Sequence, residues 1–353
     1  MYTNTFVTAW SFSQACPSRF ANTVGDQCYV YLEQEYKQVH KPEERIKRVM
    51  SRFSGVPNKN LTWKPVSLES LDLSGKRVVV VGGTGGIGRA LSKLMAARGA
   101  QVTIVGRTFR EVDTPGIHFM KADLELMSEA VRIGQTLPAE ELDLVVFTTG
   151  IMPGPARVET SEGIERDLAV SYLSRLAMLR EIGPRLGKKG TNPISKPRVF
   201  VMSMPGTNAQ GNIEDLNSEK TFSPMPAHMN TVVGNEALVL YGARQYPDIN
   251  FYGLNPGLIK SNIRSNMSGG QDSLRHRITE GIIGFLTMSA DTYARRIVPL
   301  LFSTDIESAS GAFFNQKGIA ILPSESMTPA YVNEYMEASD KLLMRVLQNV
   351  STT

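Results

Sequence analysis

Cysteines and long apolar runs are both scarce in this chain of 353 residues. The two cysteines, Cys16 and Cys28, stand near the start, which excludes a disulfide framework and a cysteine-based zinc site and favours a reducing compartment. No uninterrupted apolar run reaches about 18 residues, so we expect no membrane-spanning helix. A net charge of +4 is too small to indicate nucleic acid as the main partner.

The composition is that of an ordinary globular chain, with 42% hydrophobic and 20% charged residues. We expect a cytoplasmic protein that binds no metal. The first 25 residues are rich in Ser, Thr and Ala and contain Arg19 but no acid, which resembles an organellar targeting segment only weakly.

From residue 75 onward, apolar β-branched runs alternate with helical patterns. The first run is VVVV at 78–81, and a helix over 87–99 follows it. Such alternation predicts an α/β fold, a doubly wound parallel sheet with helices on both faces. The further strands are expected at 101–106, 117–124, 142–150, 198–206, 249–257 and 311–321, and the further helices at 128–137, 162–186 and 228–247.

The valine run ends in a glycine cluster. Gly82, Gly86 and Gly88 form the pattern G-x-x-x-G-x-G between the strand and the helix. Free N–H groups at a helix N-terminus stabilise a pyrophosphate, and glycine allows both the tight turn and the close approach of the backbone. Because the pattern stands in that structural context, it predicts a dinucleotide site, with Ile87 inside the loop.

The charge after the second strand indicates which dinucleotide is bound. An NAD site usually has Asp or Glu there, about 20 residues on, for the ribose 2′-hydroxyl. Arg107 stands 19 residues after Gly88, with no acid adjacent before Glu111. Arg107, Thr108 and Arg89 can surround a 2′-phosphate without a competing carboxylate, which favours NADP. The alternative is that these arginines only face solvent.

These segments resemble the short-chain dehydrogenase/reductase family over about 75–325, and its retinol-dehydrogenase-like branch in particular. VGGTGGIGRA is similar to the family's cofactor loop, KADL to its adenine segment, FTTG to its Asn-Asn-Ala-Gly segment and NPGLIKS to its nicotinamide segment. The insert IEDLNSEKTFSP resembles one in the branch. The resemblance implies a Rossmann fold and cofactor contacts from Asp123, Leu124, Thr149, Gly150, Pro256, Gly257 and Ser261.

The same resemblance divides the chain into three parts. Residues 75–325 would form the NADP-binding Rossmann domain, after an N-terminal extension, 1–74, that is partly helical. The segment 326–353 reads as an amphipathic helix packed on the domain. Its apolar positions at helical spacing are Val332, Tyr335, Met336, Leu342, Leu343 and Val346.

The family's catalytic pattern is incomplete in this sequence. The family uses a Ser, a Tyr, a Lys one helical turn later and an Asn on the preceding long helix. Ser203 occupies the serine position, and Asn235 sets a register that places His228 at the tyrosine position. Val232 and Ser171 then stand where the Lys and Asn are expected, and no Tyr-x-x-x-Lys occurs in the chain.

Two functions remain open from the sequence. The first is an NADP(H)-dependent oxidoreductase that acts on a carbonyl or alcohol of a hydrophobic small molecule, with Ser203 and His228 as catalytic residues. Histidine titrates near neutral pH, so an imidazolium needs no lysine to act as an acid. The alternative is a catalytically degenerate nucleotide-binding or non-redox member of the same fold.

Two surfaces are expected from the resemblance. The segment 262–289 would form a lid whose apolar residues suit an apolar substrate; the alternative is that its helix packs in the core or against a partner subunit. The helix around GNEALVLYGARQY is the one that the family uses for subunit packing, so Leu238, Val239 and Tyr241 predict a homodimer.

Overall fold

The computed structural model describes residues 54–109, 113–189, 195–257 and 288–352. These residues belong to one compact unit, Ile46–Thr353, whereas Met1–Arg45 is a separate unit. Most of the expected lid, Ser261 and the part of the expected N-terminal extension before residue 54 lie outside the described residues.

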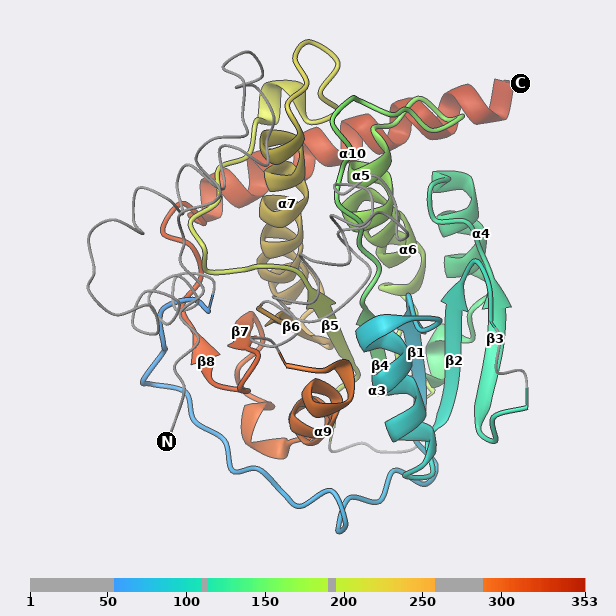
Figure 1. The fold of residues 1–353 in the computed structure, drawn as a ribbon, viewed down its shortest axis with the longest axis vertical. Helices are drawn as coiled ribbons and strands as arrows, with labels where there is room; N and C mark the ends of the chain where they lie inside the picture. Colours follow the sequence, from blue (N-terminus) through green and yellow to red (C-terminus); the bar gives the residue numbers. More distant parts are fainter. Residues whose placement is uncertain (1–53, 110–112, 190–194, 258–287, 353) are drawn as a thin grey trace, which may run out of the picture. The chain divides into compact units, whose positions relative to one another are not determined.

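The described part of the chain forms an eight-stranded sheet in the order β3-β2-β1-β4-β5-β6-β7-β8 (Figure 1). All neighbouring strands pair in parallel except β7 and β8, which are antiparallel. This confirms the doubly wound α/β fold. The strands are β1 (Arg77–Val81), β2 (Gln101–Gly106), β3 (Ile117–Lys121), β4 (Leu144–Phe147), β5 (Arg198–Met202), β6 (Asn250–Asn255), β7 (Ala312–Asn315) and β8 (Ala320–Ile321).

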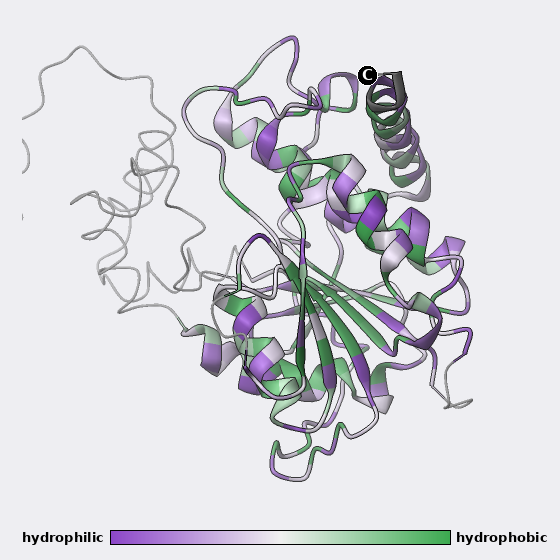
Figure 2. Cartoon of the chain, turned by 90° about the vertical axis from the view of Figure 1, so that its right-hand side faces the viewer, coloured by the Kyte–Doolittle hydropathy of each residue, from purple (hydrophilic) through white to green (hydrophobic). Residues whose placement is uncertain are grey.

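The valine run shows why the sheet needs cover on both faces. Val79 and Val81 lie in one hydrophobic cluster, and Val78 and Val80 lie in the other, because successive side chains of a strand point to opposite faces. Helices α4 (Met127–Thr136), α6 (Ser174–Ile182) and α7 (Pro224–Gln245) contribute to the first cluster. Helices α3 (Gly86–Ala96) and α9 (Ala290–Leu301) contribute to the second cluster. Figure 2 shows the apolar strands of the sheet lying between layers of helices.

The long helix expected at 162–186 is instead built from three pieces. Glu165 accepts hydrogen bonds from the N–H groups of Asp167 and Leu168 and so starts the short helix α5 (Arg166–Leu168). A π-helical turn, η2 (Ala169–Leu173), follows, and α6 continues from it. On a regular α-helix, residue i+8 is rotated by about 80° from residue i. The wider i→i+5 turn of η2 reduces that rotation, so residues eight apart across this turn stay on the same side of the helix.

The C-terminal helix α10 (Pro329–Thr352) packs on α7 and α4. The Tyr335 hydroxyl donates to the Asn230 carbonyl at 2.7 Å, and the Tyr172 hydroxyl donates to Ser339 Oγ at 2.8 Å. All six apolar positions singled out in the sequence are buried in the larger cluster.

This packing corrects the expected subunit surface. Leu238 and Val239 are only 3% and 1% exposed and share the cluster to which α10 contributes. The Arg180 guanidinium lies over the Tyr241 ring at 5.1 Å and forms an ion pair with Asp340 of α10. The expectation that Leu238 and Val239 offer free apolar surface is therefore wrong, Tyr241 is half-buried, and the homodimer itself stays a prediction.

The segment before β1 extends the sheet edge. Pro57 forms an antiparallel bridge with Ile321 of β8, and Asn58 N–H donates to the Ala320 carbonyl. The Trp63 indole N–H donates to the Gly318 carbonyl at 2.6 Å. Residues 54–74 contain no helix in the structure, so any helical part of the expected extension lies before residue 54.

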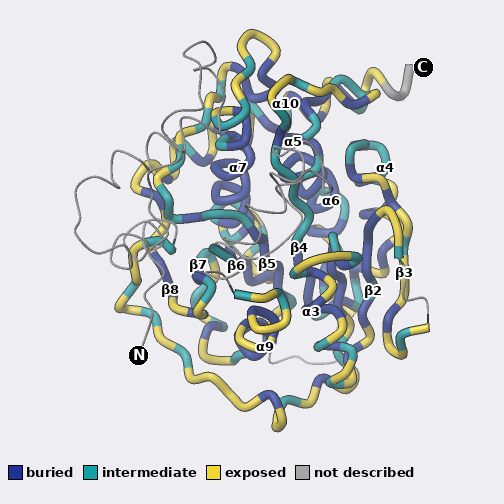
Figure 3. Tube along the Cα trace, viewed as in Figure 1, coloured by how far each residue is buried: buried dark blue, intermediate teal, exposed yellow. Residues whose placement is uncertain are grey.

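Helix α7, buried over much of its length, carries a carboxylate that joins two loops (Figure 3). Glu236 is 1% exposed and accepts hydrogen bonds from Ser324 N–H at 2.6 Å, Ser324 Oγ at 2.8 Å and Gly206 N–H at 3.2 Å. It thereby fixes the loop after β5 against the segment after β8. Burial raises the pKa of Glu236 above its usual value, and these hydrogen bonds only partly oppose the shift.

We predict that Glu236→Gln becomes increasingly stable relative to the wild type as pH rises. Because the pKa of Glu236 is raised in the folded wild type, its contribution to wild-type stability is fully present below the unfolded-state pKa and is lost as pH rises through the folded-state pKa. The amide oxygen can still accept from Ser324 and Gly206. Urea unfolding between about pH 4 and pH 8 measures this difference, since the unfolded pKa of Glu is about 4.3. Glu236→Ala should lower stability at every pH by about 1–3 kcal/mol, because it leaves buried donors unpaired. A pH-independent difference between the wild type and the Gln variant would contradict the prediction.

Candidate active site

The glycine loop presents an open face at the carboxyl edge of the sheet. Helix α3 begins at Gly86 after Gly85, which supplies no side-chain cap for the first N–H groups. A Cβ atom added at Gly85 or Gly86 would meet nothing within 4 Å, whereas one at Gly88 would lie 2.4 Å from the Gly82 carbonyl oxygen. Gly88 is therefore required for packing of helix against strand, and Gly86 leaves room for a phosphate to approach uncapped N–H groups.

The end of β4 lies beside this loop. Thr148 Oγ1 donates to the Val81 carbonyl at 2.9 Å, and a Cβ atom at Gly82 would lie 2.7 Å from Thr149 N. Thr149 Oγ1 is buried and has no hydrogen-bond partner among the described residues. An orphaned polar atom beside an open glycine face is what a polar ligand would satisfy, so the residues present fit a dinucleotide.

The expected 2′-phosphate region contains a carboxylate that sequence spacing missed. Arg89, Arg107, Thr108 and Asp123 are all exposed. Arg107 Nη1 lies 3.5 Å from Glu125 Oε1, which comes from the loop before α4 and lies also 3.6 Å from Arg166 Nε. The expectation that no carboxylate competes for Arg107 is therefore wrong.

His228 belongs to a buried polar cluster. Its Nδ1 lies 2.7 Å from Asp167 Oδ2, and the two residues are 9% and 0% exposed. The other carboxylate oxygen, Oδ1, accepts from Ser171 Oγ at 2.5 Å, and Ile151 N–H donates to the same Oγ at 3.0 Å. The histidine is thus held by an acid that the sequence analysis did not single out.

A buried guanidinium lies in the same cluster. Arg175 is 3% exposed and donates through Nη1 to Asn235 Oδ1 at 2.7 Å and to the Met202 carbonyl at 2.6 Å. Its Nη2 donates to the Thr149 carbonyl. Burial lowers the pKa of Arg175 to about 9, and the charge of Asp167 opposes this, so the group remains a cation at neutral pH. Although the lysine position is Val232, the cluster does contain a cation.

Ser203 lies where β5 meets the end of β6. Its N–H donates to the Leu254 carbonyl at 2.9 Å, and its neighbour Met202 accepts from Arg175. Asn255 Nδ2 donates to the Pro205 carbonyl at 3.0 Å, and Gly257, at φ +62°, donates its N–H to Asn255 Oδ1. The structure therefore brings Ser203 beside the Pro256–Gly257 segment.

The predicted residues are linked through these contacts. Gly82 adjoins Thr149, Arg175 binds the carbonyls of Thr149 and Met202, and Met202 precedes Ser203. Within the described residues no hydrogen bond joins Ser203 to His228 directly. Ile87 is half-buried and Leu124 is buried, so both contribute apolar packing near the loop.

A usable signal for the missed residues was present in the sequence. Asp167, Ser171 and Arg175 recur at i, i+4 and i+8 within the otherwise apolar stretch DLAVSYLSRLAML. Polar groups at helical spacing in a buried helix require partners, and they therefore indicate a polar cluster.

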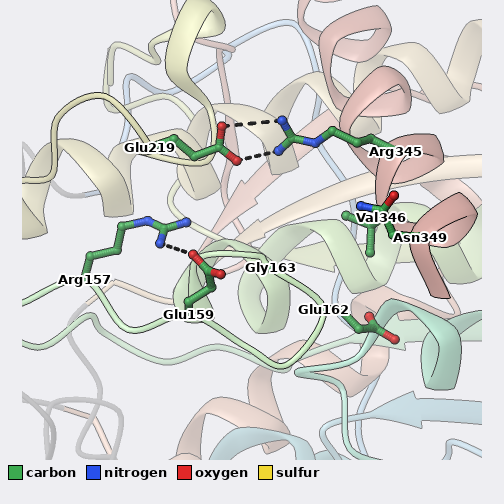
Figure 4. A pocket seen from close by; sticks show the side chains of 8 residues that line it. All are labelled: Arg157, Glu159, Glu162, Gly163, Glu219, Arg345, Val346 and Asn349. Atoms are coloured by element: carbon green, nitrogen blue, oxygen red, sulfur yellow. Dashed lines mark hydrogen bonds and ion pairs between the residues drawn. The ribbon is translucent and has the colours of Figure 1, made fainter. Parts of the chain in front are cut away.

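A separate cavity of about 530 Å³ lies between the loops that carry Arg157 and Glu219 and the part of α10 that carries Arg345 (Figure 4). Its charged groups pair with one another, as in Arg345–Glu219 at 2.5 Å and Arg157–Glu159, and Glu162 binds the N-terminal N–H groups of α4. None of its lining residues belongs to the predicted site: Arg157, Glu159, Glu162, Gly163, Glu219, Arg345, Val346 and Asn349.

Two other features are absent from the described ranges. No group of three or more His, Cys, Asp or Glu residues there is placed to hold a metal ion. Likewise, no helix in that part combines the length and apolarity needed to cross a membrane.

Residues 76–214 match the family profile described as short chain dehydrogenase. The chain is similar to an uncharacterised oxidoreductase of Saccharomyces cerevisiae, 46% identical over 295 residues, which cover 82% of this chain and 95% of that protein. It is also similar to dehydrogenase/reductase SDR family member 12 of Bos taurus, 24% identical over 84% of this chain and 93% of that protein.

Solved structures share the fold. A putative uncharacterised protein from Mycobacterium paratuberculosis has a TM-score of 0.59 and 19% identity, covering 80% of this chain and 98% of that one. The RhlG/NADP active-site complex of Pseudomonas aeruginosa has a TM-score of 0.53 and 19% identity, covering 70% of this chain and 96% of that one.

We predict that Gly86→Val abolishes NADPH binding without unfolding the protein. The added side chain would enter the open face, while the left-handed backbone at φ +51° costs roughly 1–2 kcal/mol of stability. Gly75→Val is a matched control, because Gly75 also has a positive φ and free space but lies before β1 at the opposite sheet edge. Calorimetric titration together with thermal melting separates the two effects. A Gly86→Val protein that binds NADPH normally would show that the loop is only structural.

We predict opposite effects on NADPH affinity for Arg107→Ser and Glu125→Gln. Losing a charge-assisted phosphate contact of roughly 1.5–3 kcal/mol should weaken NADPH binding about tenfold or more and leave NADH binding unchanged. Removing the competing carboxylate should strengthen NADPH binding up to about fivefold, since an exposed ion pair contributes about 0.2–1 kcal/mol. Equal losses for NADPH and NADH in Arg107→Ser would show that Arg107 does not read the 2′-phosphate.

Proposed function

The chain belongs to the short-chain dehydrogenase/reductase family of oxidoreductases, and from this premise we propose that it uses NADP(H) to interconvert a carbonyl and an alcohol on a hydrophobic small molecule. One observation carries the proposal. The open glycine face is connected to Ser203 through Thr149, Arg175 and Met202, so a cofactor site and a carbonyl-binding hydroxyl belong to one contiguous arrangement.

The residues that would hold the cofactor come from five strand ends. The glycine loop would bind the pyrophosphate, the two arginines with Thr108 the 2′-phosphate, and the segment after β3 the adenine. The bound cofactor supplies or accepts a hydride at its nicotinamide ring. The full set is Gly82, Gly86, Ile87, Gly88, Arg89, Arg107, Thr108, Asp123, Leu124, Thr149, Gly150, Pro256, Gly257 and Ser261.

The chain's own groups would bind the substrate oxygen and move one proton. The Ser203 hydroxyl donates a hydrogen bond to the carbonyl oxygen and orients it. His228 gives the proton from Nε2, because Nδ1 is engaged by Asp167. In the direction of alcohol oxidation, the same nitrogen accepts the proton.

Support for NADP over NAD comes from Arg107 and Arg89 and from the absence of an acid in the usual position after β2. The Pseudomonas aeruginosa protein that shares the fold was solved with NADP, as its description states. The apolar residues in the segment 262–289 favour a hydrophobic substrate, and the scarcity of cysteine favours a reducing compartment such as the cytoplasm.

We predict that His228→Gln lowers kcat for carbonyl reduction about 100-fold or more and leaves NADPH affinity unchanged, as expected when a general acid is lost. Ser203→Ala should lower kcat in the same way. His118→Gln is the control, because His118 is exposed on β3 and lies outside the cluster. The measurement is steady-state turnover against a panel of ketones and aldehydes, with NADPH binding followed in parallel.

Two outcomes would count against this function. Full activity in His228→Gln would make the histidine structural. If the wild type binds NADPH but reduces no carbonyl of the panel, the chain is better described as a nucleotide-binding member without reductase chemistry.

A further inference from the structure

We propose that Asp167 is a positioning residue that fixes His228 in the tautomer with the proton on Nδ1, so that an Asp–His pair takes over the proton-donor role of this site. The inference rests on the proposed function. It assigns a role to a residue that was not among the candidates of the sequence analysis.

The geometry determines which nitrogen carries the proton. Asp167 Oδ2 lies 2.7 Å from His228 Nδ1, and an ionised carboxylate can only accept a hydrogen bond. Nδ1 is therefore the donor. In the neutral ring Nε2 is then the unprotonated nitrogen, and in the imidazolium Nε2–H is the proton available for transfer.

Burial makes this interaction strong and selective. Asp167 is 0% exposed, and a buried carboxylate is costly unless it is paired and hydrogen-bonded. Ser171 Oγ binds its other oxygen at 2.5 Å, so both carboxylate oxygens are engaged and the ring cannot exchange Asp167 for water without leaving an unpaired charge. Without Asp167, the imidazole ring of His228 would therefore no longer be held in one orientation.

A cation and a second acid lie near Asp167. The Arg175 cation lies close enough for its pKa to respond to Asp167. Glu165, two residues before Asp167, is buried as well. Burial raises the pKa of Glu165, and the nearby charge of Asp167 adds to that effect, which disfavours a second anion at this place. The ionisable groups that face Asp167 are therefore the Arg175 guanidinium, the Glu165 carboxyl group, whose charged form is disfavoured by burial, and the His228 ring.

The chain builds this arrangement locally. Glu165 caps α5 at the N–H of Asp167, and the π-helical turn η2 keeps Asp167, Ser171 and Arg175 on one side. π-turns inside helices often occur at functional sites. In the proposed reduction, the His228 Nε2–H bond breaks as the O–H bond of the product alcohol forms, and the nicotinamide cofactor would supply the hydride to the carbonyl carbon. The Asp167 carboxylate keeps its hydrogen bond to Nδ1 throughout.

The first test needs no substrate. Nitrogen-15 NMR of the histidine side chains distinguishes the two neutral tautomers, and loss of one signal set in His228→Gln assigns His228 among the four histidines. We expect wild-type His228 to carry its proton on Nδ1 and Asp167→Asn to lose that preference. Asp215→Asn is the matched control, because Asp215 is a buried carboxylate that binds the N–H groups of Glu219, Lys220 and Thr221. It should leave the His228 signals unchanged.

The second test uses turnover. Asp167→Asn should lower kcat about 100-fold, keep the Kd for NADPH, and cause no further loss when combined with His228→Gln, since both changes remove one acid. A wild-type His228 with its proton on Nε2, or Asp167→Asn with wild-type NMR signals, would overturn the inference. Full kcat in Asp167→Asn beside a large loss in His228→Gln would overturn it too. Loss of the proposed function is recognised separately, by full activity in His228→Gln or by absence of turnover in a protein that shows the expected tautomer.

Discussion

A guanidinium buried at the carboxyl edge of a sheet needs acceptors for its N–H groups, because the loss of its hydration costs several kcal/mol. The two terminal nitrogens of Arg175 donate to the Thr149 carbonyl at the end of β4, to the Met202 carbonyl at the end of β5 and to Asn235 Oδ1 on α7, whereas Nε is buried without a hydrogen-bond partner among the described residues. Three elements far apart in the sequence are thereby held at fixed distances. Each carries part of the proposed site: the loop beside the glycine face, the strand end before Ser203, and the helix with His228.

Buried carboxylates complete the same framework. Asp167 holds His228, Glu165 begins the helix that presents Asp167, and Glu236 ties the loop after Ser203 to the segment beyond β8. These acids have pairs or backbone donors, as buried polar groups require. Rigid placement of this kind benefits catalysis, because a proton donor must stay aligned with an oxygen it meets only briefly.

The fold could be predicted largely because its signals are local. Four valines followed by a glycine turn identify a buried parallel strand and the start of α3, and the alternation that follows has few compact solutions. Helix α9 was not foreseen, and its Pro299 obscures the helical pattern. The break of the expected long helix at η2 was also missed, since a π-turn has no simple residue signature.

The amino-acid sequence by itself determined the sheet and the glycine turn that begins α3, because apolar runs and glycine spacing are local signals. Ser203 and His228 were candidates only through the resemblance to the family. Only the tertiary structure decided that His228 meets Asp167, 61 residues away, and that Glu125 meets Arg107. It also decided that α10 covers the surface expected for a partner subunit. Such contacts depend on how separate elements pack, and packing is set by the whole core rather than by any local pattern.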